Sequence, residues 1–462
     1  MKTNSDEMHN QEMVLKKIRQ SSEVFDKLAN SYEVWVPESG WLAGRRNRDK
    51  NDSKRKNLTD WSILSFLLEI DNCHYPMADS YLQYGIDGVI RIAAETLETL
   101  KNNLQSELQD QTQLDIAYLE SLLHVWKRFR QFVADHMVLA LECVKQETSD
   151  TKKKRYEKIA KICQNLTINK PNTFCEALQL FWFTYLFRSP FGAGCIGRLD
   201  QLLYPFYKHD CEMGIWDQQE AEKMLEEMFT RMNEINTGDT LRNLMLSGQD
   251  AKGNDQTNEI TYLILVAYEN TGGSEPHLNV RFHEKTPKKL RDNCINMLSS
   301  GSGQPTIYFD EAVLPAMEKA GICHEDACQY ANDGCTETVI AGKSAIVFWQ
   351  YEMVKTVELT LFGGNENPCV KPVSMKKNSI HGVDFVPKTN LLIGIESKKT
   401  QELTTFSEFL SAFFEQMDHQ LDHYFLMIKQ KMQEDQTVSI TSPFTAGTFE
   451  KCLRTGKDPL RG

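Results

Sequence analysis

The residues best suited to chemistry are Cys335 and Glu337, two positions apart and directly after the turn dipeptide Asp333-Gly334. Glycine accepts a positive φ without steric penalty and aspartate bonds to its own following backbone, so the chain is predicted to reverse just before Cys335. Residues 336–340 are β-branched apart from Glu337, which predicts an extended segment. Positions i and i+2 of a strand point to the same side, about 7 Å apart, so the thiol and the carboxylate are expected to share one face of a loop tip.

A thiol and a carboxylate in this arrangement support two kinds of chemistry on one small substrate. The sulfur of Cys335 is suited to hydrogen-atom transfer or nucleophilic attack, and Glu337 is suited to proton transfer. The alternative is a buried cysteine beside a solvated glutamate in an ordinary hairpin. Residues 330–338 taken alone favour that structural alternative, and the flanking sequence reverses the preference.

Composition describes a large, ordinary globular chain. The 462 residues are 41% apolar and 25% charged, with a net charge of −12. No apolar run reaches the roughly 20 residues of a membrane span, and residues 1–20 are polar without a signal-peptide core. We therefore expect a cytoplasmic protein with no membrane partner. The basic clusters at 45–48 and 152–155 lie in polar linkers, so nucleic acid is not expected as a partner.

Cysteine spacing argues against metal and disulfide chemistry. The twelve cysteines are dispersed and include no CxxC pair. The nearest cluster, Cys323-His324, Cys328 and Cys335, lacks the spacing of a zinc site. We expect no bound metal and reduced thiols, most of them packed as small apolar residues.

The first half of the chain is predicted to form a helical layer. Residues 1–60 show no clear period and predict a loop-rich entry. Apolar residues recur at three- and four-residue steps over 77–104 and 114–146, which predicts two helices. A capping box at Thr173 to Glu176 precedes an almost wholly apolar segment ending at Phe187, which predicts a buried helix.

The second half alternates between strand and helix patterns, which predicts an α/β layout. The expected strands are 244–247, 277–282 and the end of 301–309. The expected helices are 219–235 with Asp217 as its cap, 261–268, 286–298 with Thr286 as its cap, 348–361, and 406–433 with a capping box at Thr405 to Glu408. Arg198 and Asp200 are suited to an anionic substrate, but a structural salt-bridge pair is the preferred interpretation.

The stretch from Gly321 to Glu337 resembles the active-site cysteine loop of the glycyl radical enzymes, the pyruvate formate-lyase family. Further blocks follow in that family's order, and the resemblance covers about residues 71–462. It implies a ten-stranded α/β barrel surrounded by helices and incomplete at the C-terminus. The expected domains are an abbreviated N-terminal segment, 1–70, and a catalytic domain, 71–462, with a helical layer at about 77–187 and the barrel and cysteine loop at about 190–462.

The resemblance also implies roles for individual residues. Cys335 matches the thiyl residue that removes a hydrogen atom from substrate carbon, and Glu337 matches the base of the eliminating members. Asp71 and His74 lie near positions that contact substrate in the family, although structural roles are preferred for both. The implied reaction is dehydration or C–X cleavage of a small hydroxylated or amino-alcohol-like substrate, in a homodimer.

The first of two departures from the family pattern lies in the cysteine loop. Gly334 precedes Cys335 where pyruvate formate-lyase has a second cysteine, which disfavours formate C-acetyltransferase-like acyl transfer. The sequence Cys-Thr-Glu-Thr is closer to the Cys-x-Glu-Pro loop of diol, hydroxyproline and choline lyases and arylacetate decarboxylases, but lacks its proline.

The second departure concerns the radical itself. The family's Arg-Val-x-Gly-Tyr motif is absent from the sequence, so a C-terminal glycine radical domain is not expected and the chain is predicted to be inactive alone. Truncation is the favoured explanation, and a separate glycyl-radical subunit or a radical-dead descendant are alternatives. The resemblance implies a radical SAM activating enzyme as a partner. A catalytically silent scaffold or binding protein is the alternative from a different functional class.

Overall fold

The computed structural model describes most of the chain. The described residues are 4–45, 66, 78–103, 109–188, 194–234, 242–273, 275–334, 337–344, 353–365, 394–396, 402–438 and 440–460. Contacts divide the chain into two units, one formed by residues 1–14 and 347–439 and the other by residues 15–346 and 440–462. Each unit is described by itself below.

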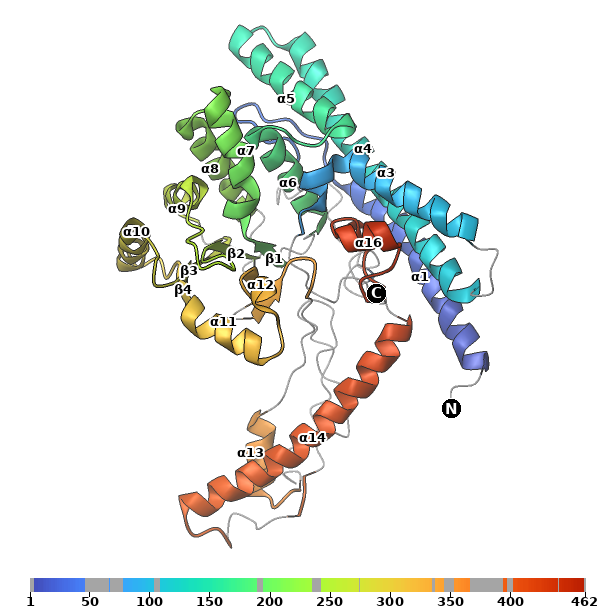
Figure 1. Cartoon of the computed structure of the whole chain (residues 1–462), viewed down its shortest axis with the longest axis vertical. Coiled ribbons are helices and arrows are strands. Elements are labelled where there is room, and N and C mark those ends of the chain that lie inside the picture. The colour runs from blue at the N-terminus through green and yellow to red at the C-terminus, as the bar shows by residue number, and fades with distance from the viewer. Residues whose placement is uncertain are drawn as a thin grey trace, which may run out of the picture. The chain divides into compact units, whose positions relative to one another are not determined.

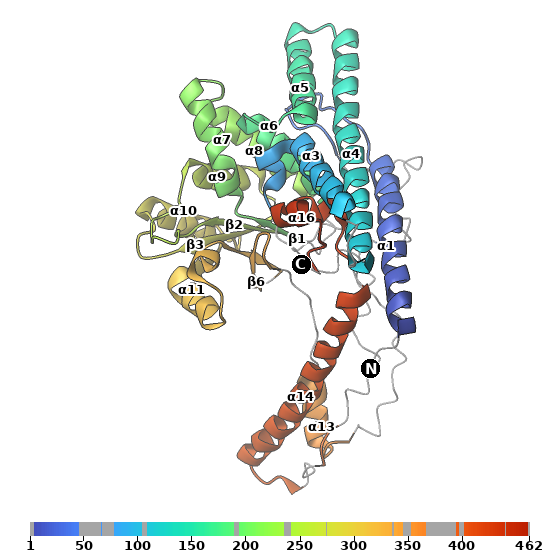
Figure 2. The same cartoon turned by 45° about the vertical axis from the view of Figure 1, so that its right-hand side comes forward.

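A layer of helices begins the larger unit (Figure 1). It comprises α1 (Asn4–Ser31), of which residues 15–31 belong to this unit, together with α3 (Ser80–Asn103), α4 (Gln109–Gln146), α5 (Asp150–Ile168) and α6 (Phe174–Arg188). Helices α4 and α5 run side by side, and α3 packs along α4 (Figure 2). The helices predicted at 77–104 and 114–146 are therefore confirmed as α3 and α4.

Helix α1 corrects the prediction of a loop-rich entry. Its apolar residues Ile18, Phe25 and Leu28 recur at helical spacing and are 1%, 4% and 1% exposed. Ser21 on the same face bonds to Ser121 of α4 at 3.0 Å. The many polar residues on the other face concealed this narrow apolar stripe from sequence inspection.

Helix α6 is the buried helix that the sequence predicts. The predicted capping box is present. The Thr173 hydroxyl accepts from the Glu176 N–H at 3.3 Å, and the Glu176 carboxylate accepts from the Thr173 N–H at 3.2 Å. Every residue from Phe174 to Phe187 except Glu176 is buried. The side chains that surround α6 therefore form the centre of the unit's core.

His136 of α4 lies in this core and predicts a pH-dependent stability. Its Nδ1 bonds to the carbonyl oxygen of Phe132 at 2.8 Å, and its ring packs on Phe132 and Phe183. Burial lowers the pKa of His136 from 6.5 to about 4. The unfolded chain therefore takes up a proton between pH 6.5 and pH 4 that the folded chain does not, so stability falls as the pH decreases through this window.

We expect the wild-type free energy of unfolding to decrease by on the order of 3 kcal/mol from this imidazole alone across the window. Urea unfolding at pH 7 and pH 4 measures it. His136→Leu should remove this part of the pH dependence, whereas His124→Leu, at a half-exposed imidazole that pairs with Asp26, should not. An unchanged pH dependence in the His136 variant would contradict the assignment.

A parallel sheet follows the helical layer. Its strands β1 (Gly194–Gly197), β2 (Arg242–Ser247), β3 (His277–Phe282) and β4 (Thr306–Phe309) lie in chain order and pair in parallel. The helices between and after these strands are α7 (Leu199–Met213), α8 (Gln218–Glu234), α9 (Glu259–Thr271), α10 (Lys288–Ser299), α11 (Asp310–Lys319) and α12 (His324–Ala327). The predicted α/β layout is confirmed by this alternation.

The two predicted helix caps in this region have different outcomes. Asp217 caps α8 as predicted, since its carboxylate accepts from the Glu220 N–H at 2.9 Å. Thr286 does not cap α10, because the helix begins at Lys288 after Pro287 and has no side-chain cap. The Thr286 hydroxyl instead accepts from the His283 N–H at 2.7 Å, which tightens the turn before the helix.

The C-terminal segment returns to the helical layer. It contains the short helices α15 (Pro443–Ala446) and α16 (Glu450–Thr455). The Ser80 hydroxyl donates to the carbonyl oxygen of Gly447 at 2.9 Å, and the ring of Phe444 stacks on Trp126 at 5.1 Å. Residues 440–460 are thus integrated into the larger unit's core.

The smaller unit contains α13 (Met353–Leu361) and α14 (Phe406–Val438), which pack on each other. The predicted capping box of α14 is present, with Glu408 N–H donating to the Thr405 hydroxyl at 3.2 Å. Gln416 of α14 bonds to both the N–H and the carbonyl of Ile395. Across the described parts of the two units, no helix combines the length and apolarity that crossing a bilayer requires.

Candidate active site

A two-stranded hairpin carries the predicted Cys-x-Glu sequence. Strand β5 (Tyr330–Asp333) pairs antiparallel with β6 (Glu337–Ile340), and Asp333 and Glu337 are Cα partners. The predicted reversal and the extended segment are therefore confirmed. Residues 334–336 connect the strands, and Cys335, midway between them in the sequence, lies outside the described residues.

The carboxylate of Glu337 lies at the tip of this hairpin. Gly334 has φ 56°, and a Cβ atom added to it would lie 2.5 Å from Glu337 Oε2. The glutamate side chain therefore covers the residue directly before Cys335. Glu337 is half-buried, so its side chain is partly accessible to solvent.

This contact predicts the outcome of Gly334→Ala. The left-handed backbone alone should lower the free energy of unfolding by about 1 kcal/mol, and the new methyl group should displace the Glu337 carboxylate. Gly272→Ala is a matched control, because Gly272 has φ 57° and open space around its Cα. In denaturant unfolding, only the Gly334 variant should show coupling to Glu337→Ala in a double-mutant cycle. If the effects of Gly334→Ala and Gly272→Ala on stability were both additive with that of Glu337→Ala, the contact between Gly334 and Glu337 would be contradicted.

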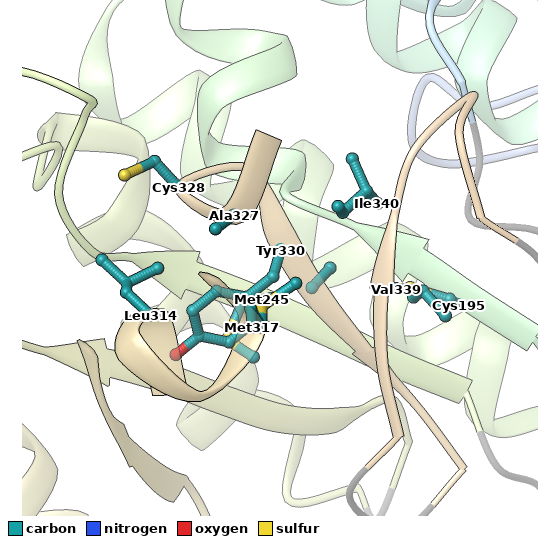
Figure 3. Close-up of a cluster of buried hydrophobic side chains, with 10 residues drawn as sticks. Cys195, Met245, Leu314, Met317, Ala327, Cys328, Tyr330, Val339 and Ile340 are labelled. Atoms are coloured by element: carbon teal, nitrogen blue, oxygen red, sulfur yellow. The ribbon is translucent and has the colours of Figure 1, made fainter. Parts of the chain in front are cut away.

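The hairpin packs on one face of the sheet, which we call the hairpin-bearing face and define by Cys195, Asn243, Met245, Asn279 and Arg281. Val339 of β6 lies near Cys195 of β1, and Tyr330 of β5 lies with Met245 and Met317 (Figure 3). Burial, with the Asp333 carboxylate adding to it, holds the pKa of the Cys195 thiol well above its ordinary value. Cys195 is thus a packing residue beneath the hairpin.

Two buried arginines fix the base of the hairpin. The Arg281 guanidinium makes two bonds of 2.8 Å to Asp310, and the Tyr330 hydroxyl donates to the same carboxylate at 3.0 Å. Arg281 Nη1 also donates to the carbonyl oxygen of Cys328 at 2.9 Å, and Arg198 donates to that oxygen at 3.2 Å. Burial and the neighbouring Arg281 lower the pKa of Arg198 to about 10.

One amide on the hairpin has no hydrogen bond to any residue that the structure describes. Asn332 of β5 is completely buried, and this holds for both its Nδ2 and its Oδ1. Burying such a group unpaired costs about 1–3 kcal/mol.

The predicted site residues have three outcomes. Glu337 lies at the hairpin tip, as predicted. Cys335, Asp71 and His74 lie outside the described residues. Arg198 and Asp200 are buried and bond to the protein, but these two described residues do not form the predicted salt bridge with each other. Arg198 donates to the Ser247 carbonyl oxygen at 2.9 Å, and Asp200 accepts from the Ser247 N–H at 2.8 Å and from the Thr261 hydroxyl at 2.8 Å.

Sequence inspection missed the polar residues of the hairpin-bearing face. Asn243 donates from Nδ2 to the carbonyl oxygen of Gly334 at 2.8 Å, next to the Cys335 position. The available signal was the presence of polar residues in otherwise apolar strands, at alternate positions in His277–Phe282 and at 242, 243 and 247 in Arg242–Ser247. The described residues contain no group of three or more histidine, cysteine, aspartate or glutamate side chains arranged to hold a metal ion.

Comparison with known proteins identifies the family. The family described as Pyruvate formate lyase-like matches residues 72–462. The chain therefore belongs to the pyruvate formate lyase-like family, as the cysteine-loop resemblance predicts.

Two curated relatives are dehydratases. The chain is 30% identical over 347 residues to trans-4-hydroxy-L-proline dehydratase of Clostridioides difficile, which covers 70% of this chain and 41% of the relative. It is 26% identical over 397 residues to (2S)-3-sulfopropanediol dehydratase of Klebsiella oxytoca, covering 82% of this chain and 45% of the relative. The chain thus spans less than half the length of these curated relatives.

Solved structures share the fold. The glycerol-bound B12-independent glycerol dehydratase from Clostridium butyricum superposes with a TM-score of 0.76 at 20% identity, covering 98% of this chain and 65% of that chain. A glycyl radical enzyme from Archaeoglobus fulgidus superposes with a TM-score of 0.74 at 20% identity, covering 97% of this chain and 64% of that chain.

Proposed function

We propose that the chain supplies the thiol and the base of a glycyl radical lyase that eliminates water, or a comparable leaving group, from a small hydroxylated substrate. The observation that carries this proposal is the Glu337 carboxylate at the hairpin tip, against the residue that precedes Cys335. The relatives reported above act on hydroxyproline and on a sulfopropanediol, so hydroxyl elimination is the reaction class that this pair of groups fits best.

In the proposed reaction the sulfur and the carboxylate act in sequence. A glycyl radical, when supplied, provides the unpaired electron that makes the Cys335 sulfur a hydrogen-atom acceptor. Cys335 removes a hydrogen atom from the substrate carbon next to the one that carries the leaving hydroxyl. Glu337 accepts a proton from the hydroxyl or amine on the attacked carbon as the neighbouring C–O bond breaks. The departing hydroxide takes a proton from solvent and leaves as water, and Glu337 later releases its proton to solvent. Cys335 then returns its hydrogen atom to the product carbon, so no external oxidant or reductant is consumed.

The proposal includes the setting of the site. The four parallel strands β1 to β4 are assigned to a ten-stranded α/β barrel whose interior face carries the hairpin. A radical SAM activase and a glycyl-radical-bearing polypeptide complete the system, and a homodimer is the proposed assembly.

Reconstitution tests this function. The chain is combined anaerobically with a glycyl-radical polypeptide and a radical SAM activase, and trans-4-hydroxy-L-proline and small diols are offered as substrates. We expect dehydration of at least one of them, and a fall below about one-thousandth of the wild-type rate in Cys335→Ala. Cys211→Ala, at an exposed thiol, is the matched control and should retain activity. Undiminished turnover in Cys335→Ala, or substrate binding without turnover by the wild type, would overturn the proposal.

A further inference from the structure

Two buried amides connect the sheet to the hairpin tip. Asn279 of β3 donates from Nδ2 to Asn243 Oδ1 at 2.9 Å, and Asn243 of β2 donates from Nδ2 to the Gly334 carbonyl oxygen at 2.8 Å. Both asparagines are 2% exposed. The chain of bonds therefore runs through the protein interior from one strand to the next and ends on the peptide group that joins Gly334 to Cys335.

Asn279, the first residue in this series of hydrogen bonds, is itself held by backbone carbonyl groups. Asn279 Nδ2 lies 3.3 Å from the carbonyl oxygen of His277 and 3.5 Å from that of Leu244. These contacts orient the Asn279 amide so that its N–H points at Asn243 Oδ1. An asparagine whose oxygen is occupied in this way presents its nitrogen to the next acceptor, which here is Gly334.

Gly334 is restrained at its carbonyl, its N–H and its Cα. Its carbonyl accepts from Asn243, its N–H donates to Asp333 Oδ1 at 2.9 Å, and the Glu337 carboxylate covers its Cα. A buried carbonyl needs a donor in any turn, but here the donor, Asn243, is itself oriented by a second buried amide on the neighbouring strand. This degree of restraint fits a turn whose following side chain must keep one orientation.

We propose that Asn243 and Asn279 are positioning residues for Cys335, holding the Gly334–Cys335 peptide so that the thiol keeps the orientation that hydrogen-atom transfer needs. The inference rests on the proposed function of Cys335. Transfer of an atom between two groups depends steeply on their separation, and a misplacement of about 1 Å lowers a rate by about 100-fold.

The first test uses the chain alone and does not depend on turnover. Alkylation of Cys335 by iodoacetamide is followed by mass spectrometry, with exposed Cys211 as the internal reference. We expect Asn243→Leu and the isosteric Asn243→Asp, which lacks the N–H donor, to raise the relative rate at Cys335 about fivefold, the change expected for loss of one hydrogen bond. Asn279→Leu should act in the same direction with a smaller effect.

Asn233→Leu is the matched control. Asn233 is a half-buried asparagine whose Nδ2 donates to the carbonyl oxygens of Phe229 and Glu275, so its loss disturbs the fold without touching the hairpin tip. The relative rate at Cys335 should stay within twofold of wild type in this variant. A wild-type rate in both Asn243 variants, or an equal increase in Asn233→Leu, would overturn the inference.

The second test uses the reconstituted system described above. Asn243→Leu should lower kcat about 10- to 100-fold and leave KM within twofold, because substrate binding is intact and only the reacting atom is displaced. If the wild type is inactive on every substrate, the proposed function fails while the alkylation result still decides the positioning role. If the wild type is active, Cys335→Ala is inactive and Asn243→Leu matches wild type, the function stands and the positioning role is wrong.

Discussion

Arg281→Met is expected to lower the free energy of unfolding by about 3–5 kcal/mol, since it leaves the Asp310 carboxylate buried without its charge partner. Both side chains are 0% exposed, and the two bonds between them are 2.8 Å long. The guanidinium also lies 4.0 Å from the centre of the Tyr330 ring, so its loss removes packing at the base of the hairpin. Denaturant unfolding of the intact chain measures the effect.

Two further variants separate this explanation from general damage. Arg91→Met breaks an ion pair with Glu95 in which both side chains are 62% exposed, and should change stability by less than about 1 kcal/mol. Adding Asp310→Leu to Arg281→Met should restore part of the loss, because the stranded charge is then gone. If Arg281→Met were as mild as Arg91→Met, the buried pair would not be what secures the hairpin.

Glu337→Gln is expected to separate the two halves of the proposed reaction. The amide keeps the size of the carboxylate but cannot accept a proton, so product formation should fall by about 100- to 10,000-fold. Hydrogen transfer at Cys335 does not use the carboxylate and should continue. In D₂O the S–H bond formed at Cys335 exchanges its hydrogen with solvent before the atom is returned, so unreacted substrate should gain deuterium at the carbon that Cys335 attacks.

The comparison for this variant is a distant carboxylate of similar exposure. Asp87 on α3 pairs with Arg130, with the two side chains 46% and 37% exposed, and Asp87→Asn should leave both product formation and deuterium uptake within twofold of wild type. Loss of deuterium uptake together with product in Glu337→Gln would mean that the glutamate holds the site together rather than moving a proton.

The hairpin could be predicted from the sequence because its determinants are local. Asp333-Gly334 specifies the reversal, the β-branched residues after it specify the strand, and both lie within eight residues. Capping boxes at Thr173 and Thr405 are equally local and are confirmed. Residues whose structural role depends only on their neighbours in the sequence can be predicted before the fold is known.

The supports of the hairpin could not be predicted in this way. Arg281 meets Asp310 at a separation of 29 positions, Asn279 meets Asn243 at 36, and Asn243 meets Gly334 at 91. Asn243 and Asn279 meet because parallel strands place alternate residues on one face, and Arg281 and Asn243 reach helix α11 and the hairpin only because those elements lie against the sheet. The sequence shows only scattered polar residues in apolar strands. Helix α1 was missed for a related reason, since its apolar stripe is visible as a core contact only once α4 lies beside it.

The most direct measurement of the central claim is the deuterium content of substrate recovered from the reconstituted system in D₂O. Wild type and Glu337→Gln should both place deuterium on the reacting carbon. Cys335→Ser should place none, because the serine O–H bond is too strong for a glycyl radical to break. Deuterium uptake in Cys335→Ser equal to that of wild type would show that another group transfers the hydrogen atom, and the hairpin tip would not be the active site.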